Sequence, residues 1–271
     1  MKRALAALLA VASASCGPPH LTLPSGAGTP AEPSAASEAL QQASRCRGVR
    51  TLTAEIAVSG SAGGRRVRGR LTGGVERPAS ARLEAVAPFG QPLFIFVATG
   101  DVATLLLPRD NRILEHGRPD EVLDAVSGVP ADAAALADLV SGCVTPAPTS
   151  EARAFGDTWL RYASGAGDAT YLRRDRPGAP WRVVAAERRA WHVEFGAFLT
   201  LASGEIPSLI RLTSPAAAAS PFDLKLSLSQ VEVNVTLKPQ TFTVQTPKSA
   251  QPITIEELRQ SGPLAQKGDG R

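Results

Sequence analysis

The alternation of apolar and polar residues predicts a protein built mainly of β-strands. From Val49 onward, residues 52–58 place apolar side chains at every second position, which is the period of a strand with one buried face. A turn rich in small residues follows at 61–64 and leads into a second strand over 65–77. The pattern therefore predicts a long β-hairpin at the start of the folded domain.

The stretch from Ser80 to Cys143 is the most informative part of the chain. It predicts four strands, Ser80–Ala87, Pro92–Thr99, Val102–Leu107 and Ile113–His116. The second of these has no polar face, because Leu93, Ile95 and Val97 share one side while Phe94 and Phe96 share the other. We expect this strand to be covered on both sides.

Two short amphipathic helices are predicted next, Asp120–Ser127 and Pro130–Ser141. Each is followed by a glycine, Gly128 or Gly142, as is typical of helix ends. The helices interrupt the run of strands, so we expect them to form a lid over the sheet.

Strands resume after the helices, and nothing in their order alternates as strand, helix, strand. They are predicted at Phe155–Tyr162, Ala169–Arg174, Trp181–Glu187, Trp191–Phe198, Ile206–Thr213, Phe222–Ser229 and Val231–Leu237, with a bulge near Gln230. The predicted fold class is mainly β with a helical lid (α+β): a highly curved antiparallel sheet forms an unclosed β-barrel covered by short helices. The apolar inner face is a candidate binding site, and ordinary packed core is the alternative.

The start of the chain predicts export. Met1-Lys2-Arg3 precedes an apolar run over 4–12, and the segment 1–15 has the architecture of a signal peptide. Cleavage is expected after Ala14 or at Cys16, and residues 13–16 resemble a bacterial lipoprotein signal, which makes Cys16 the expected lipid attachment site. Residues 16–37, rich in Pro, Ser, Ala and Gly, are interpreted as the lipidated Cys and a flexible tether, followed by a short helix over 38–45.

Three cysteines in an exported protein leave one without a partner. If Cys16 carries lipid, Cys46 and Cys143 remain as a pair that an oxidising compartment would join. Two buried free thiols are the alternative.

Composition limits the classes of partner. The chain is 44% hydrophobic, enough for a substantial core, and its formal net charge is +4. The charge falls to about +2 when Lys2 and Arg3 leave with the signal, which is too weak to indicate nucleic acid. The basic cluster over 65–70 fits a solvated strand face, contact with lipid headgroups or, least well, nucleic acid.

No catalytic or cofactor motif is present in the sequence. The three histidines, at 20, 116 and 192, are scattered, and no nucleotide-binding or nucleophile-elbow spacing occurs. Asp120 and Glu121 open a helix, where carboxylates stabilise the helix dipole. The expectation is a protein that is not an enzyme and that has no cofactor and no metal.

The stretch Arg82 to Gly142 carries a family resemblance. Residues 82–90, with Pro88-Phe89-Gly90 at a loop, and the helix end Val126-Ser127-Gly128-Val129-Pro130 resemble the outer-membrane receptor of the LolA/LolB lipoprotein-localisation family. Weaker agreement extends from Trp181 through the later strands. The resemblance assigns residues 38–247 to a LolA/LolB-like half-barrel and leaves 248–271 as a C-terminal tail with a short helix.

The resemblance implies an outer-membrane, lipid-anchored, periplasm-facing protein that binds the acyl chains of lipoproteins or lipids and delivers them to the membrane, with a periplasmic LolA-like carrier as a further partner. Pro88, Phe89 and Gly90 would form a membrane-insertion loop. The expected cavity lining is Leu83, Leu93, Ile95, Leu105, Val122, Leu139 and Val183. The alternative is a structural envelope lipoprotein that acts as a partner-binding scaffold without a lipid ligand.

Overall fold

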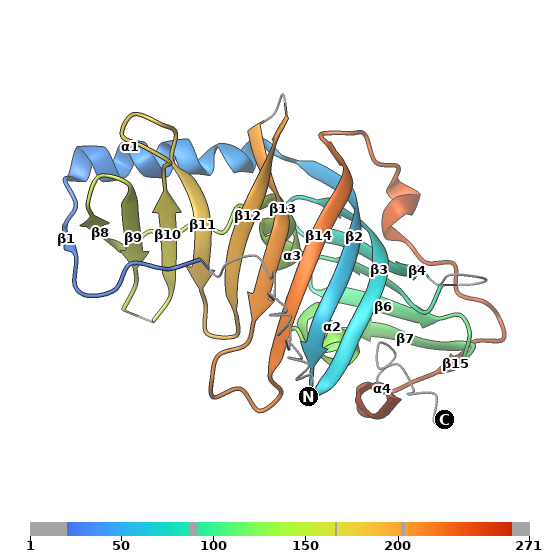
Figure 1. The fold of residues 1–271 in the computed structure, drawn as a ribbon. Helices are drawn as coiled ribbons and strands as arrows, with labels where there is room; N and C mark the ends of the chain where they lie inside the picture. Colours follow the sequence, from blue (N-terminus) through green and yellow to red (C-terminus); the bar gives the residue numbers. More distant parts are fainter. Residues whose placement is uncertain (1–20, 87–91, 166, 202–203, 262–271) are drawn as a thin grey trace, which may run out of the picture.

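A computed structural model describes residues 21–86, 92–165, 167–201 and 204–261. The fifteen strands in this part of the chain form one sheet, in the order β1-β8-β9-β10-β11-β12-β13-β14-β2-β3-β4-β5-β6-β7-β15 (Figure 1). All neighbours are antiparallel except β15 and β7, which are parallel. The sheet curves strongly and stays open between its edge strands β1 and β15. The predicted fold class is confirmed.

The first half of the sheet in sequence contains β1 (Thr29–Pro30), β2 (Thr51–Ala62), β3 (Arg65–Glu76), β4 (Ser80–Val86), β5 (Ile95–Thr99), β6 (Val102–Leu107) and β7 (Arg112–Gly117). The second half contains β8 (Glu151–Phe155), β9 (Trp159–Ala163), β10 (Ala169–Arg173), β11 (Arg182–Glu187), β12 (His192–Leu201), β13 (Gly204–Thr213), β14 (Phe222–Val233) and β15 (Gln251–Pro252). The two halves join where β14 pairs with β2 along most of its length. The register of that pair shifts between Ser229 and Glu232, and Gln230 has a φ of 50°, so the bulge predicted near Gln230 is present.

The helices lie mainly on one side of the sheet. They are α1 (Pro33–Ala43), η1 (Ser44–Gly48), α2 (Pro119–Ser127), α3 (Ala133–Ser141), η2 (Pro239–Phe242) and α4 (Ile255–Ser261). Helix α1 crosses β9 to β11, while α2 and α3 cover the strands from β13 to β6. We call the face under these three helices the inner face and the opposite one the outer face.

The inner face is apolar along the whole sheet. Strand alternation places Leu52, Leu105, Leu160, Val193 and Ile210 on it, and all five belong to one continuous hydrophobic core with the helices. That core is the main source of stability for the fold.

Two chain segments cover parts of the outer face. Leu21 and Leu23 pack against Tyr171 and Val184 on the outer side of β10 and β11. At the other end, the Arg82 guanidinium donates hydrogen bonds to the carbonyl oxygens of residues 241 and 243, at 3.1 and 2.9 Å, which fixes the C-terminal segment over β4. These segments therefore shield parts of the outer face from solvent, through leucines at β10 and β11 and through hydrogen bonds at β4.

The tether predicted for residues 16–37 differs from the structure. From Leu21 the chain packs on the sheet, β1 pairs with β8, and α1 begins at Pro33 rather than at residue 38. Apolar residues at 21 and 23, and a proline at the first turn of α1, provide the physical reason. In the C-terminal tail, β15 and α4 also pack on the domain, because Ile253 and Leu258 are buried.

Candidate functional site

Helices α2 and α3 form the predicted lid, and local sequence signals set their ends. Proline occupies the first turn of α2, and Gly128 ends it with a φ of 76°. The Asp132 carboxylate accepts a hydrogen bond from the backbone N–H of Ala135, at 2.7 Å, and so caps α3. Gly142 ends α3 with a φ of 67°, a conformation that other residues adopt with strain.

Helix α1 completes the cover over the inner face through small side chains. Its buried residues are Ala36, Ala39 and Ala43, and the Tyr162 hydroxyl donates a hydrogen bond of 2.6 Å to the carbonyl oxygen of Ala36. Burial raises the pKa of Tyr162 to about 12. Three buried methyl groups contribute about 2 kcal/mol, well below the contribution of three leucines. Leu40 of α1 adds a partly buried contact with the core, so the apolar contact of α1 with the sheet is small for its length.

Five of the seven expected lining residues lie on the inner face. Leu83, Leu105, Val122, Leu139 and Val183 are all at most 8% exposed and belong to the hydrophobic core. They pack against other side chains and helices, so the space beneath the lid is filled at these positions. A ligand that reaches them has to displace part of the lid.

The other two expected lining residues lie elsewhere. Leu93 is half-buried at the margin of the core. Ile95 points to the outer face, because its neighbour Phe96 pairs with Leu83 and Leu105 on the inner face. Phe96 and Phe94 are therefore the core residues of this strand, and the expected orientation of β5 is reversed. The strand is apolar on both sides, so alternation alone could not distinguish its faces.

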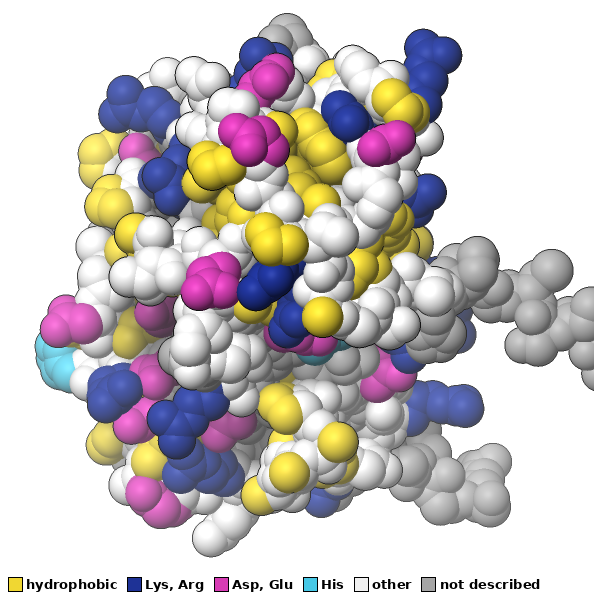
Figure 2. All heavy atoms as spheres, turned by 90° about the vertical axis from the view of Figure 1, so that its left-hand side faces the viewer, with side chains coloured by type: hydrophobic (Ala, Val, Ile, Leu, Met, Phe, Trp, Pro, Cys, Tyr) yellow, Lys and Arg dark blue, Asp and Glu magenta, His cyan; other side chains and the backbone are white. Residues whose placement is uncertain are grey.

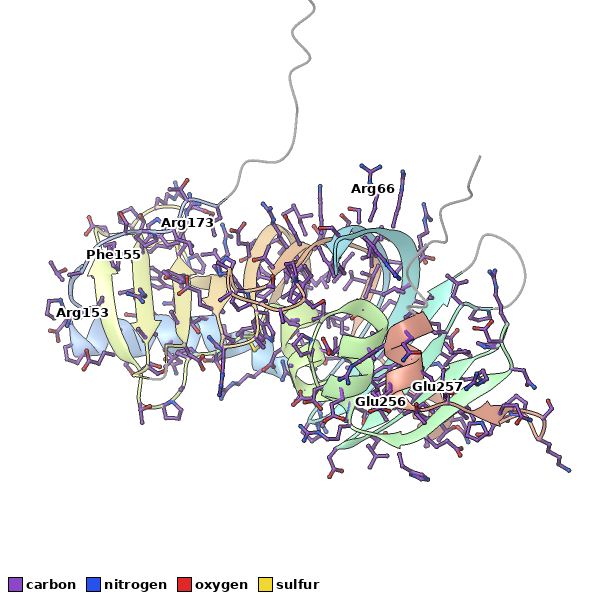
Figure 3. The ribbon with its side chains drawn as sticks, turned by 90° about the horizontal axis from the view of Figure 1, so that it is seen from below. Arg66, Arg153, Phe155, Arg173, Glu256 and Glu257 are labelled. Carbon is purple, nitrogen blue, oxygen red and sulfur yellow. A yellow bond between two sulfur atoms is a disulfide. The ribbon has the colours of Figure 1, made fainter. Side chains whose placement is uncertain are left out.

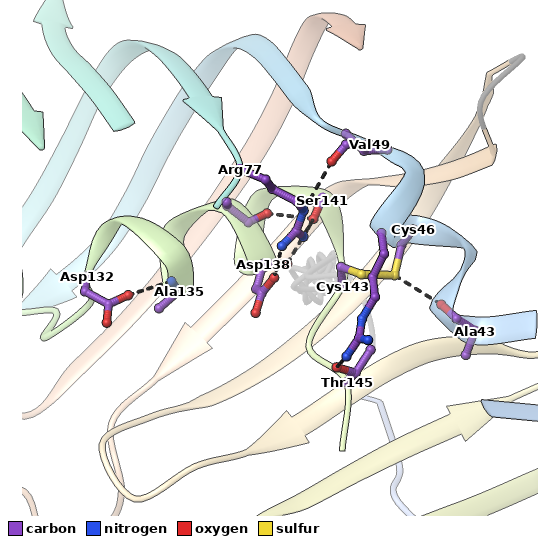
Figure 4. Close-up of polar contacts among 12 residues, drawn as sticks. Ala43, Cys46, Val49, Arg77, Asp132, Ala135, Asp138, Ser141, Cys143 and Thr145 are labelled. Atoms are coloured by element: carbon purple, nitrogen blue, oxygen red, sulfur yellow. Dashed lines mark hydrogen bonds and ion pairs between the residues drawn. A yellow bond between two sulfur atoms is a disulfide. The ribbon is translucent and has the colours of Figure 1, made fainter. Parts of the chain in front are cut away.

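A polar cluster and a disulfide hold the C-terminal end of α3 (Figure 4). The Arg77 guanidinium donates to the Asp138 carboxylate at 2.6 Å, to the Ser141 hydroxyl at 3.1 Å and to the carbonyl oxygen of Val49 at 3.2 Å. Burial raises the pKa of the Asp138 carboxyl, and the charge of Arg77 opposes that rise. The cluster fixes α3 to the start of β2.

Cys46 and Cys143 are joined in a disulfide, with their Cα atoms 5.4 Å apart. Cys46 lies in η1, directly after α1, and Cys143 follows the end of α3. Next to the bridge, the Arg47 guanidinium donates a hydrogen bond of 2.7 Å to the Thr145 hydroxyl. The disulfide therefore connects the two helical parts of the lid.

A cavity of about 290 Å³ opens at the edge of the sheet, between α1 and the strands β8 and β9. Ala31, Ala35, Leu160 and Trp181 supply apolar parts of its wall. Figure 2 looks onto this edge and shows hydrophobic side chains recessed between charged ones. The sequence interpretation missed this site because it began the helix at residue 38, although Pro33 is the signal that places the helix start earlier.

The remaining expected site residues, Cys16 and the loop residues Pro88, Phe89 and Gly90, lie outside the described residues. Across the ranges that the structure does describe, no three His, Cys, Asp or Glu side chains come together as a metal site would require. No helix in these ranges has the length and apolar character to span a bilayer. The described residues therefore offer two features to a ligand: an apolar inner face, packed under the helices, and an edge cavity whose wall also carries the polar side chains of Glu32, Glu38, Gln42, Asp157 and Arg174.

Comparison of the sequence with models of protein families gave no match, and comparison with curated proteins gave none either. Solved structures give matches. They include a LolA superfamily protein from Nitrosomonas europaea, at 12% identity and a TM-score of 0.50, with 76% of this chain and 98% of that chain covered. A DUF1329 family protein from Desulfovibrio piger matches at 10% identity and a TM-score of 0.49, covering 76% of this chain and 96% of that one.

A putative outer membrane lipoprotein-sorting protein domain from Vibrio parahaemolyticus matches at 11% identity and a TM-score of 0.46, covering 76% of this chain and 97% of that one. At such identities a likeness establishes the fold alone, and the match at a TM-score of 0.50 carries that conclusion. The resemblance predicted from residues 82–142 is confirmed at the level of fold: this chain has the fold of the LolA superfamily.

Proposed function

We propose that the protein is an outer-membrane lipoprotein, anchored through Cys16, that binds acyl chains of lipids or lipid-modified proteins beneath its helices and delivers them to the membrane. A periplasmic LolA-like carrier would supply the cargo. The proposal is not enzymatic, since burial of an acyl chain needs no reacting group.

The observation that carries the proposal is an apolar inner face covered by a helix that contacts it through three buried alanines and the partly buried Leu40. A bound acyl chain gains about 0.8 kcal/mol for each methylene that leaves water. Burial of several methylenes therefore offsets the contribution of the three alanines and of the partly buried Leu40 of α1. Displacement of α1 by hydrocarbon is favourable on this basis, without any polar recognition.

The edge cavity supplies the access route. It lies between α1 and β9, and Leu160 connects its wall to the core, where Val183 lies two strands away. An acyl chain that starts in the cavity can extend along the inner face as α1 moves outward. The disulfide keeps η1 attached to the end of α3 during that movement.

The fold supports the same function, because one structure that shares it is a LolA superfamily protein. A second candidate, a structural envelope lipoprotein without a lipid ligand, is favoured by the filled core, in which Leu105 and Val122 are completely buried. The two candidates differ in whether an acyl chain can displace α1 from the inner face.

A substitution at the edge cavity tests the proposal. Ala35 is exposed on α1 and lines the cavity, so Ala35→Trp fills the access route without disturbing the core. We expect the affinity for a fluorescent fatty acid to fall by about tenfold or more, equivalent to about 1.4 kcal/mol.

Ser37→Trp is the matched control, since Ser37 is also exposed on α1 but does not line the cavity. Its affinity should stay within about twofold of the wild type, a difference well under 1 kcal/mol. If the wild-type protein binds no fatty acid, or if both variants bind as it does, the proposed site is wrong.

A further inference from the structure

A groove of about 1440 Å³ runs along the outer face, on the side of the sheet opposite the helices. Strands β3, β2, β14, β13 and β12 form one part of its wall, and β9, β10 and the N-terminal segment form the other. Figure 3 shows Arg66 and Arg173 projecting from this face, away from the helices. The groove lies on the opposite face of the sheet from the acyl-chain site, and the lining of the two meets only at Trp159 of β9.

The groove is positively charged. Its lining includes the basic residues Arg66, Arg68, Arg173, Arg211 and Lys225 and the acidic residues Glu194 and Asp223, for a net charge of +3. Arg211 pairs with Asp223 at 2.7 Å. Within the described part of the chain, Arg66, Arg68 and Lys225 form no ion pair.

The register of the sheet concentrates these cations. Arg68 lies opposite Ser59, Ser59 opposite Lys225, and Lys225 directly opposite Arg211, whose other cross-strand neighbour is Glu194. Like charges in directly opposed positions destabilise a sheet. Asp223 and Glu194 offset this cost at Arg211, whereas Lys225 and Arg68 have no ion-pair partner among the described residues. An external anion would therefore be stabilised at this end of the row.

The N-terminal segment indicates which anion is available. Leu21 and Thr22 line the same groove, so the chain enters the described domain at this place. Leu21 lies five positions after Cys16, and five residue steps reach about 17 Å at most. A lipid on Cys16 would therefore hold the groove within reach of the bilayer surface.

We propose that this groove binds the anionic headgroups of the membrane in which the protein is anchored, and so orients the domain with its outer face toward the bilayer. The orientation rests on the proposed lipid anchor at Cys16, whereas the affinity for anionic lipid rests on the groove alone. Each basic side chain near an anionic surface increases the binding constant about fivefold, so three contribute about 100-fold.

The test uses the full chain with Cys16→Ala, because the substitution removes the anchor and leaves the groove intact. Binding is measured by co-sedimentation with vesicles of phosphatidylcholine containing about one third phosphatidylglycerol, at low ionic strength. We expect binding to these vesicles and none to phosphatidylcholine alone. The triple variant Arg66→Gln, Arg68→Gln, Lys225→Gln should bind about 100-fold more weakly.

The matched control is Arg45→Gln, Arg176→Gln, Lys248→Gln, which removes the same number of charges from exposed residues outside the groove. It should retain the parent affinity within about twofold, and the thermal midpoints of all three proteins show whether they are folded. Equal binding by the two triple variants would overturn the proposal, as would absence of binding by the parent. Binding of polyglutamate by the groove without vesicle binding would also overturn it and would assign an acidic peptide instead.

Failure of this proposal is distinguishable from failure of the proposed function. Fatty-acid binding beneath the helices depends on the inner face and is measured on the same proteins. Neither triple variant should change it, because none of the substituted residues lies on the inner face or lines the edge cavity.

Discussion

Removal of the disulfide should have two separable effects, one on stability and one on the lid. The bridge between Cys46 and Cys143 spans a sequence separation of 97 residues. For a closed loop of about 100 residues, the loss of chain entropy in the unfolded state contributes about 4.7 kcal/mol at 25 °C. We therefore expect the double variant Cys46→Ala, Cys143→Ala to lose about 4 kcal/mol of its free energy of unfolding.

In a domain of this size, such a loss lowers the thermal midpoint by about 8 to 16 °C. The assay is thermal unfolding followed by circular dichroism, with and without a reducing agent. The thermal midpoint of the wild-type protein in reductant should approach that of the double variant. The reductant should not change the thermal midpoint of the double variant. The double variant with and without reductant is the matched control, because it shows any effect of the reductant that does not come from breaking the disulfide.

Removal of the disulfide should lower stability but speed up ligand binding. The bond connects η1 at the end of α1 to the end of α3, so its loss should let the lid open more easily. Fatty acid should then bind the reduced protein faster than the oxidised protein at a temperature where both are folded. An unchanged thermal midpoint in the double variant would refute the stability argument, and an unchanged association rate would refute the role of the bond in restraining the lid.

Four further predictions follow from single residues. Leu105 is completely buried in the core, so Leu105→Ala should lower the free energy of unfolding by about 3 kcal/mol in a denaturant titration. A loss under about 1 kcal/mol would contradict the packing described. Burial raises the folded-state pKa of Tyr162 from 10.0 to about 12. The contribution of the neutral Tyr162 side chain to stability is therefore complete below about pH 10 and is lost as the pH rises through 12. In Tyr162→Phe, the free energy of unfolding should no longer show this loss between about pH 10 and 12. Phe89→Glu should abolish transfer of cargo to liposomes while the protein stays folded, and undiminished transfer would show that the loop has no insertion role. Cys16→Ala should release the protein from the envelope membrane into the soluble fraction, whereas retention in the membrane fraction would exclude a lipid anchor at this residue.

The sequence predicted the fold well where polar and apolar positions alternate. The hairpin of β2 and β3, the bulge at Gln230 and the helix ends at Gly128 and Gly142 each follow from a local signal that tertiary packing does not override. Helix α3 begins at Ala133 rather than Pro130, because the Asp132 side chain supplies the cap.

The sequence could not predict features that depend on which segments cover which face. We expect Ile95 on the inner face, and it lies on the outer one. Both faces of β5 are apolar, and the C-terminal segment, which contacts β4 and β5, covers the outer one, so alternation does not distinguish the two faces. Leu21 and Leu23 lie in a stretch whose composition suggested a tether, yet two leucines are enough to fix it to the sheet. The edge cavity depends on where α1 crosses β9, which no local pattern specifies.

The central claim is that hydrocarbon binds between the helices and the inner face. Trp181 lines the edge cavity, and Trp191 lies in the core, so a brominated acyl chain bound there would quench their fluorescence. The most direct measurement is quenching by a brominated fatty acid in the wild type and in Ala35→Trp, corrected for the added tryptophan with Ser37→Trp. We expect saturable quenching in the wild type and in Ser37→Trp, and saturation only at much higher fatty-acid concentration in Ala35→Trp. Absence of quenching in all three proteins would contradict the central claim and favour a structural lipoprotein with a closed core.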